Sequence, residues 1–111
     1  MEYEHPRMVP RYPILGDIEL TDVQSGIQIR GRTKDLSLFG CGVDALKHFP
    51  RGTSVRIKLS HGSAGVAALG RVVYASPELG MGVVFSSVEQ ESERILGGWI
   101  AELMSIPIQK Q

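Results

Sequence analysis

The sequence predicts a mainly β fold, a six-stranded antiparallel β-barrel followed by one C-terminal α-helix. Between residues 14 and 85, short segments alternate apolar and polar residues, as half-buried strands do. The 111 residues include 13 glycines, a density typical of the tight turns and bulges of a β-rich domain. After residue 85 the apolar residues recur at helical spacing instead. Because a closed sheet leaves no strand edge exposed, we expect a barrel with the helix covering an open end or side.

An N-terminal arm is predicted ahead of this single domain. Residues 1–13 contain Pro6, Pro10 and Pro13 among charged residues. Proline fixes φ and removes a backbone donor, so we expect a flexible, extended arm rather than a helix. The barrel and helix then occupy residues 14–106, and no linker or internal repeat divides them.

The strands are predicted from alternation and from the turn residues between them. The clearest alternation lies at residues 54–59, where Val55, Ile57 and Leu59 should point into the core. Clusters of Gly, Pro, Asp and Ser interrupt the alternating segments and predict turns. The predicted strands are residues 14–20, 27–33, 41–45, 54–59, 66–75 and 79–85, and the predicted turns and loops include residues 22–26, 61–65 and 76–78.

The C-terminal helix is predicted from one apolar stripe. The segment from Ser86 to Glu89 matches a capping box, which predicts that the helix begins there, and Pro107 ends it. Gly97 and Gly98 lie off the stripe and each costs about 1 kcal/mol relative to alanine, so we expect a bent or locally loosened helix. The stripe consists of Ile95, Leu96, Trp99, Ile100, Leu103 and Met104.

Composition excludes several classes of protein. With 12 Lys+Arg against 12 Asp+Glu the chain has no net charge, so we expect no DNA or RNA partner. The charge is uneven, since residues 1–71 carry a net +3 and residues 72–111 a net −3, which allows a modest anion site in the N-terminal part. No stretch approaches the roughly 18 apolar residues of a membrane span, and the N-terminus has no apolar signal core. Together with the single Cys41, this predicts a cytoplasmic protein without membrane insertion.

Catalytic motifs are weak in this sequence. His5, His48 and His61 are widely separated and no cysteine pair is present, so we predict no metal site. Cys41 lies between glycines in strand-like sequence and is predicted to be a small buried hydrophobe rather than a nucleophile. No serine has a histidine and an aspartate in an arrangement that suggests a triad. We therefore expect neither an enzyme nor a cofactor.

Two short motifs become informative when they are taken together. Arg7 and Arg11 lie four residues apart in the arm, and Asp35-Leu-Ser37-Leu-Phe-Gly40 joins the second predicted strand to the third. Each motif alone is ordinary, because terminal arginines are usually solvated and an Asp/Ser/Gly cluster is usually a turn. In this order and spacing, Arg-x-x-x-Arg followed by Asp-x-Ser-x-x-Gly resembles the binding signature of PilZ domains. The resemblance covers about residues 5–105 and includes the segments 49–53, 70–74 and 80–85.

This resemblance implies a PilZ-type barrel and a bacterial receptor for cyclic di-guanosine monophosphate (cyclic di-GMP). It implies that Arg7 and Arg11 contact guanine and phosphate, which suits the planar fork of a guanidinium. Asp35 would accept hydrogen bonds from guanine N–H groups, and Ser37 would make one further hydrogen bond. Gly40 would allow the backbone to approach the ligand where a side chain would collide.

Gly42, Arg32 and Arg71 are weaker candidates for the same site. Gly42 extends the glycine pattern of the second motif. Arg32 is expected on the outward face of the strand that leads into Asp35. For Arg32 and Arg71 a solvated strand face explains the residue as well as a position at the rim of the site does.

The resemblance also implies an output through an unidentified downstream protein. Binding would order the arm so that Arg7 and Arg11 clamp the ligand against residues 35–40, and the new surface would regulate motility or biofilm and exopolysaccharide production. One alternative is a nucleotide-independent interaction module of PilZ type, for example in pilus assembly. A small barrel that binds single-stranded nucleic acid fits less well, because aromatic residues make up only 6% of the chain.

Overall fold

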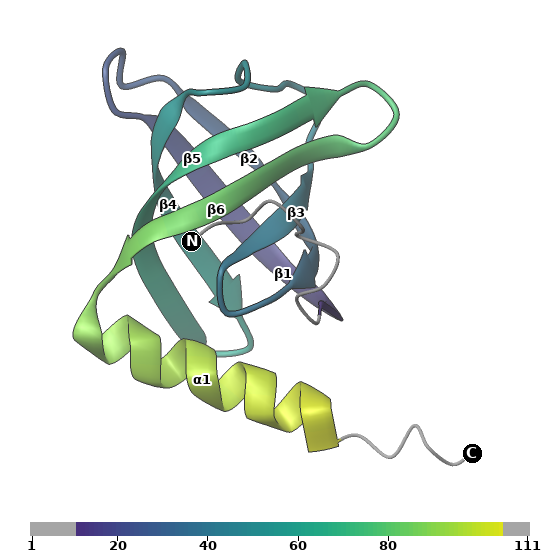
Figure 1. The fold of residues 1–111 in the computed structure, drawn as a ribbon, viewed down its shortest axis with the longest axis vertical. Coiled ribbons are helices and arrows are strands. Elements are labelled where there is room, and N and C mark those ends of the chain that lie inside the picture. Colours follow the sequence, from purple (N-terminus) through teal and green to yellow (C-terminus); the bar gives the residue numbers. More distant parts are fainter. Residues whose placement is uncertain (1–10, 106–111) are drawn as a thin grey trace.

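The computed structural model describes residues 11–105 of the chain, and these form a closed antiparallel barrel with one helix. The strand order is β1-β2-β3-β6-β5-β4, and β4 pairs back onto β1 to close the barrel (Figure 1). The predicted fold class is therefore confirmed. The elements are β1 (Tyr12–Asp22), β2 (Gln28–Leu36), β3 (Gly40–Asp44), β4 (Ser54–His61), β5 (Ala64–Ser76), β6 (Gly80–Val88) and α1 (Gln90–Ser105).

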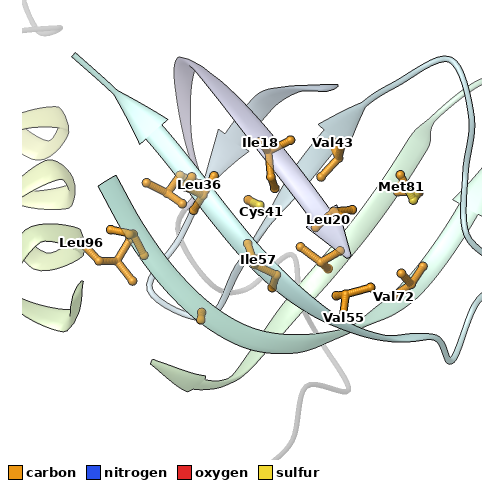
Figure 2. Close-up of a cluster of buried hydrophobic side chains, with 14 of the residues drawn as sticks. Ile18, Leu20, Leu36, Cys41, Val43, Val55, Ile57, Val72, Met81 and Leu96 are labelled. Carbon is orange, nitrogen blue, oxygen red and sulfur yellow. The ribbon is translucent and has the colours of Figure 1, made fainter. Parts of the chain in front are cut away.

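Aliphatic side chains from all six strands fill the interior of the barrel (Figure 2). Val55, Ile57 and Leu59 of β4 are buried, as their alternation predicts. Burial of one such side chain contributes about 1.5–3 kcal/mol, so this shared interior is the main source of the stability of the barrel. Leu20 and Leu36 are among the largest side chains that are fully buried there.

The helix α1 lies across the end of the barrel at which β6 ends (Figure 1). It packs against β5 and β1 through Leu96, Trp99 and Ile100, which are buried and confirm most of the predicted apolar stripe. Met104 was expected on this stripe, but its side chain is 61% exposed. Leu103 in the same turn is partly buried against the core, so only Met104 of the stripe points to solvent.

The predicted start of the helix is wrong. Ser86 lies in β6, which continues to Val88 because its last residues pair with β5, and α1 begins only at Gln90. Pairing with β5 therefore makes strand of residues that the local sequence predicts to be a helix cap. The α-helix then runs through Gly97 and Gly98 without a break.

The turn after β4 and the start of β1 also differ from the prediction. The expected loop at residues 61–65 is a tight turn between His61 and Ala64, made possible by the positive φ of Gly62. The strand β1 begins at Tyr12, so the end of the expected arm already belongs to the sheet. Pro13 is tolerated there because this part of β1 pairs with β2 but not yet with β4.

Candidate functional site

Arg11 and Asp35 meet on the outer surface of the barrel, 24 residues apart in sequence. Nη2 and Nε of Arg11 donate to Oδ1 of Asp35 at 2.7 and 3.2 Å. Both side chains are about one-third exposed, so water screens this ion pair only in part. Burial acts to lower the pKa of Arg11, but hydrogen bonding and charge interaction with Asp35, and more weakly with Tyr74, outweigh it and raise that pKa. The guanidinium is thus a fixed cation at this surface.

A β-bulge turns the side chain of Asp35 outward. Thr33 and Leu36 are both buried, which strict alternation along β2 does not permit for residues three apart. The register with β3 shifts between Thr33 and Asp35, so that Lys34 is the extra residue. Lys34 points away from the core and its Nζ donates to the carbonyl of Leu79. The bulge therefore extends β2 through Asp35, which the sequence placed in a connecting segment.

The backbone of Gly42 binds the carboxylate of Asp35. Its N–H donates to Oδ1 of Asp35 at 3.0 Å. A Cβ at Gly42 would lie 3.1 and 3.2 Å from the two carboxylate oxygens, closer than an ordinary contact. The weaker candidate Gly42 is thus brought into the site, where its missing side chain leaves room for Asp35.

Ser37 and Gly40 form the turn that connects β2 and β3. The buried hydroxyl of Ser37 accepts a hydrogen bond from the N–H of Phe39 at 3.0 Å and donates to the carbonyl of Gly40 at 3.4 Å. A Cβ at Gly40 would lie 2.1 Å from the carbonyl oxygen of Val83, so the close approach of β6 already requires glycine here. Both motif residues therefore have structural roles in this turn, beside the ligand contacts that the sequence predicts.

Tyr74 and Gly82 were not predicted as site residues, yet they complete this surface. The ring of Tyr74 lies over Gly82, and a Cβ at Gly82 would be 2.1 Å from Cε2 of that ring. The available signal was an aromatic residue on one strand and a glycine on the next, but the sequence does not show that the two are in register. A pocket opens here, lined by Arg11, Ser37, Gly40, Tyr74 and Gly82 together with apolar groups.

Cys41 lies beneath the pocket and is buried, which confirms its predicted character. Burial, reinforced by the charge of Asp35 and opposed by that of Arg11, raises the pKa of the Cys41 thiol to about 12. Such a thiol is a poor nucleophile at neutral pH.

The other predicted arginines lie apart from this cluster or outside the described residues. Arg32 is exposed and pairs loosely with Asp17 at 3.5 Å, away from the pocket. Arg71 is exposed on β5 and does not line the pocket. It lies close by, because Val84, its partner on β6, is also the partner of Gly40. Arg7 lies outside the described residues.

Two negative findings apply to residues 11–105. No group of three or more His, Cys, Asp or Glu side chains in this part of the chain could hold a metal ion. The helix that it contains is neither long enough nor apolar enough to cross a membrane.

The family model for the PilZ domain matches residues 4–102. This chain belongs to the PilZ family. No curated protein matches it.

Solved structures, among them two PilZ domains, share the fold at low identity. The PilZ domain of YcgR from Escherichia coli, solved with c-di-GMP, has a TM-score of 0.68 and 19% identity, over 86% of this chain and 89% of that one. The PilZ domain of CeSA from a cellulose-synthesizing bacterium has a TM-score of 0.65 and 20% identity, over 86% and 98%. The inhibitor of motility MotI/DgrA from Bacillus subtilis has a TM-score of 0.68 and 14% identity, over 100% of this chain and 55% of that one.

Proposed function

We propose that this PilZ domain is a receptor for cyclic di-GMP that binds the ligand through Arg7, Arg11, Asp35, Ser37 and Gly40. The observation that carries the proposal is the fixed guanidinium of Arg11, held by Asp35 at 2.7 Å beside a pocket that Ser37 and Gly40 help to line. A guanidinium held in this way is a preorganised partner for phosphate or for the O6 and N7 atoms of guanine.

The donors and acceptors of this site suit such a ligand. An arginine side chain has five N–H donors, and Arg11 uses two of them on Asp35. Its other donors remain for a ligand and for Tyr74. On Asp35, Oδ1 accepts from both Arg11 and Gly42, and among residues 11–105 no hydrogen bond to Oδ2 is found, so Oδ2 would accept from guanine N–H groups. The ligand is a dianion, and Arg7 would supply the second cation.

We further propose that binding changes the surface around residues 1–11 and that a downstream protein recognises the change. Ordering costs about 1–2 kcal/mol for each residue that becomes fixed, so the charge-assisted contacts of Arg7 and Arg11 must exceed this cost. A partner that prefers the bound form would then link ligand concentration to an output such as motility or exopolysaccharide production.

Isothermal titration calorimetry with cyclic di-GMP tests the proposal. We expect saturable heat from the wild type at tens of micromolar protein, and binding at least about tenfold weaker for Arg11→Ala and for Arg7→Ala, because each loses a charge-assisted contact. Arg56→Ala is the matched control, since it removes an exposed arginine of β4 and should bind like the wild type.

Two results would contradict this function. Folded wild-type protein without saturable heat would favour the nucleotide-independent interaction module instead. Normal binding by both Arg7→Ala and Arg11→Ala would show that the ligand occupies a different site.

A further inference from the structure

Tyr74 and Asp35 lie at opposite ends of one row of residues that crosses four neighbouring strands. The register of four neighbouring strands aligns Asp35 of β2 with Gly42 of β3, Gly42 with Gly82 of β6, and Gly82 with Tyr74 of β5. This row has a functional side chain at each end and two glycines between them. The two glycines leave room above the backbone for the side chains of Asp35 and Tyr74.

The two ends of the row are built in the same way. A register shift between Val72 and Tyr74 marks a bulge in β5, as the shift before Asp35 marks one in β2. Each bulge re-aims the side chain that follows it. Each of those side chains then lies over the neighbouring glycine, with the ring of Tyr74 against Gly82 and the carboxylate of Asp35 against Gly42.

Arg11 interacts with both ends of this row. Its guanidinium forms the ion pair with Asp35, and it lines the pocket together with Tyr74 and Gly82. Hydrogen bonding and charge interaction with Tyr74 add to the effect of Asp35 in raising the pKa of Arg11. Because arginine has no acceptor, a hydrogen bond between them would run from the guanidinium to the hydroxyl oxygen of Tyr74.

We propose that Tyr74 is a positioning residue that holds the guanidinium of Arg11 from the side opposite Asp35. This inference rests on the proposed function and adds a residue to it. A guanidinium held from one side can still turn about its bond to the carboxylate, whereas one held from two sides presents its remaining donors in a single orientation. Gly82 has a part in the same arrangement, because only a residue without a side chain lets the Tyr74 ring approach β6 so closely.

Titration of Tyr74→Phe with cyclic di-GMP tests the role of the hydroxyl. The variant keeps the ring on Gly82 and loses only the oxygen, so we expect an unchanged fold and about tenfold weaker binding. Tyr12→Phe, which removes a hydroxyl from the start of β1, is the matched control and should bind like the wild type. If the wild type binds and Tyr74→Phe binds equally well, the positioning role is overturned while the proposed function stands.

A double-mutant cycle separates positioning from direct contact with the ligand. If Tyr74 acts through Arg11, Tyr74→Phe should change binding less than about twofold in the Arg11→Ala background. A tenfold loss in that background as well would mean that Tyr74 contacts the ligand itself, and the positioning role would be overturned.

A measurement without ligand keeps the inference testable if the wild type fails to bind. The Nε–H signal of Arg11 can be assigned in nitrogen-15 spectra by its loss in Arg11→Ala. We expect its exchange with water to be several-fold faster in Tyr74→Phe, because a guanidinium that has lost one of its two partners opens more often. Equal exchange in the wild type and Tyr74→Phe would show that the hydroxyl does not hold Arg11.

Discussion

Gly40, which ends the second motif, and Gly42 beyond it differ in the group that a side chain at each position would collide with. Gly40 faces the carbonyl of Val83 at 2.1 Å, which is backbone and cannot move without distorting β6. Gly42 faces the carboxylate of Asp35 at 3.1 Å, which is the end of a side chain and can shift. Gly40 is therefore required by the fold, whereas Gly42 is required by the position of the Asp35 carboxylate.

Alanine substitution at Gly40 and at Gly42 should separate these two roles. Gly40→Ala should lower the free energy of unfolding by about 2 kcal/mol or more, because the new methyl group collides with backbone. Gly42→Ala should cost less than about 1 kcal/mol but weaken cyclic di-GMP binding several-fold, because it moves the carboxylate that holds Arg11. Urea denaturation and calorimetry measure the two effects. Equal stability losses with unchanged binding would contradict the assignment.

At the scale of elements, bulges in β2 and β5 place the site while the remaining strand segments supply the core. Regular alternation alone would direct Asp35 toward the interior, where a carboxylate would be costly to bury. Because of the bulge at Lys34, the side chain of Leu36 lies in the core and that of Asp35 lies at the surface. The helix α1 has a different task, because it covers the end of the barrel with Leu96, Trp99 and Ile100.

Gly97 and Gly98 leave α1 less stable than it could be. A Cβ at either position would meet no atom within 4 Å, and neither glycine has a positive φ. Gly97→Ala and Gly98→Ala should each raise the free energy of unfolding by roughly 0.5–1 kcal/mol, because alanine loses less backbone entropy in a helix. Thermal or urea unfolding measures this. A loss of stability in either variant would show that a partner or a second copy packs closely against this face.

For the whole molecule, the absence of net charge is compatible with the localised anion site that we propose. Most of the described arginines are exposed on strands, whereas Arg11 is fixed by Asp35 beside a pocket. Binding of one small dianion depends on the position of such cations and needs no basic face. Burial, reinforced by the charge of Asp35, raises the pKa of Cys41 beneath this surface, which links the stability of the barrel to pH.

The thiol of Cys41 should make the protein less stable in alkali. Its pKa is raised to about 12 in the folded state from an ordinary value of 9.0, so the unfolded chain loses this proton first as pH rises. The contribution is fully present below pH 9 and is lost between pH 9 and about 12, at up to about 1.4 kcal/mol per pH unit.

Comparison with Cys41→Ala isolates this effect from the other groups that titrate in alkali. The free energy of unfolding of the wild type should fall more steeply from pH 8 to pH 11 than that of the variant. Parallel pH profiles for the two proteins would contradict the raised pKa.

Much of the fold and the centre of the site were predictable from the sequence. Val55, Ile57 and Leu59 alternate with charged residues, and a strand with one buried face requires that pattern wherever it sits. The family motif predicted that Arg11 and Asp35 share one site, but not that they form an ion pair. The limits of β6 were not predictable, because Ser86 and Ser87 favour a helix start locally and only pairing with β5 makes them strand.

The sequence by itself determined the class of this protein: a small barrel, a covering helix and the residues of the PilZ signature. Local periodicity and short motifs carry that information, because each depends on neighbours along the chain. The tertiary structure alone decided that Asp35 faces outward, that Gly42 supports it, and that Tyr74 and Gly82 join Arg11 at the pocket. These side-chain positions depend on bulges and on the register between strands that are distant in sequence. That register is fixed only when the whole barrel closes.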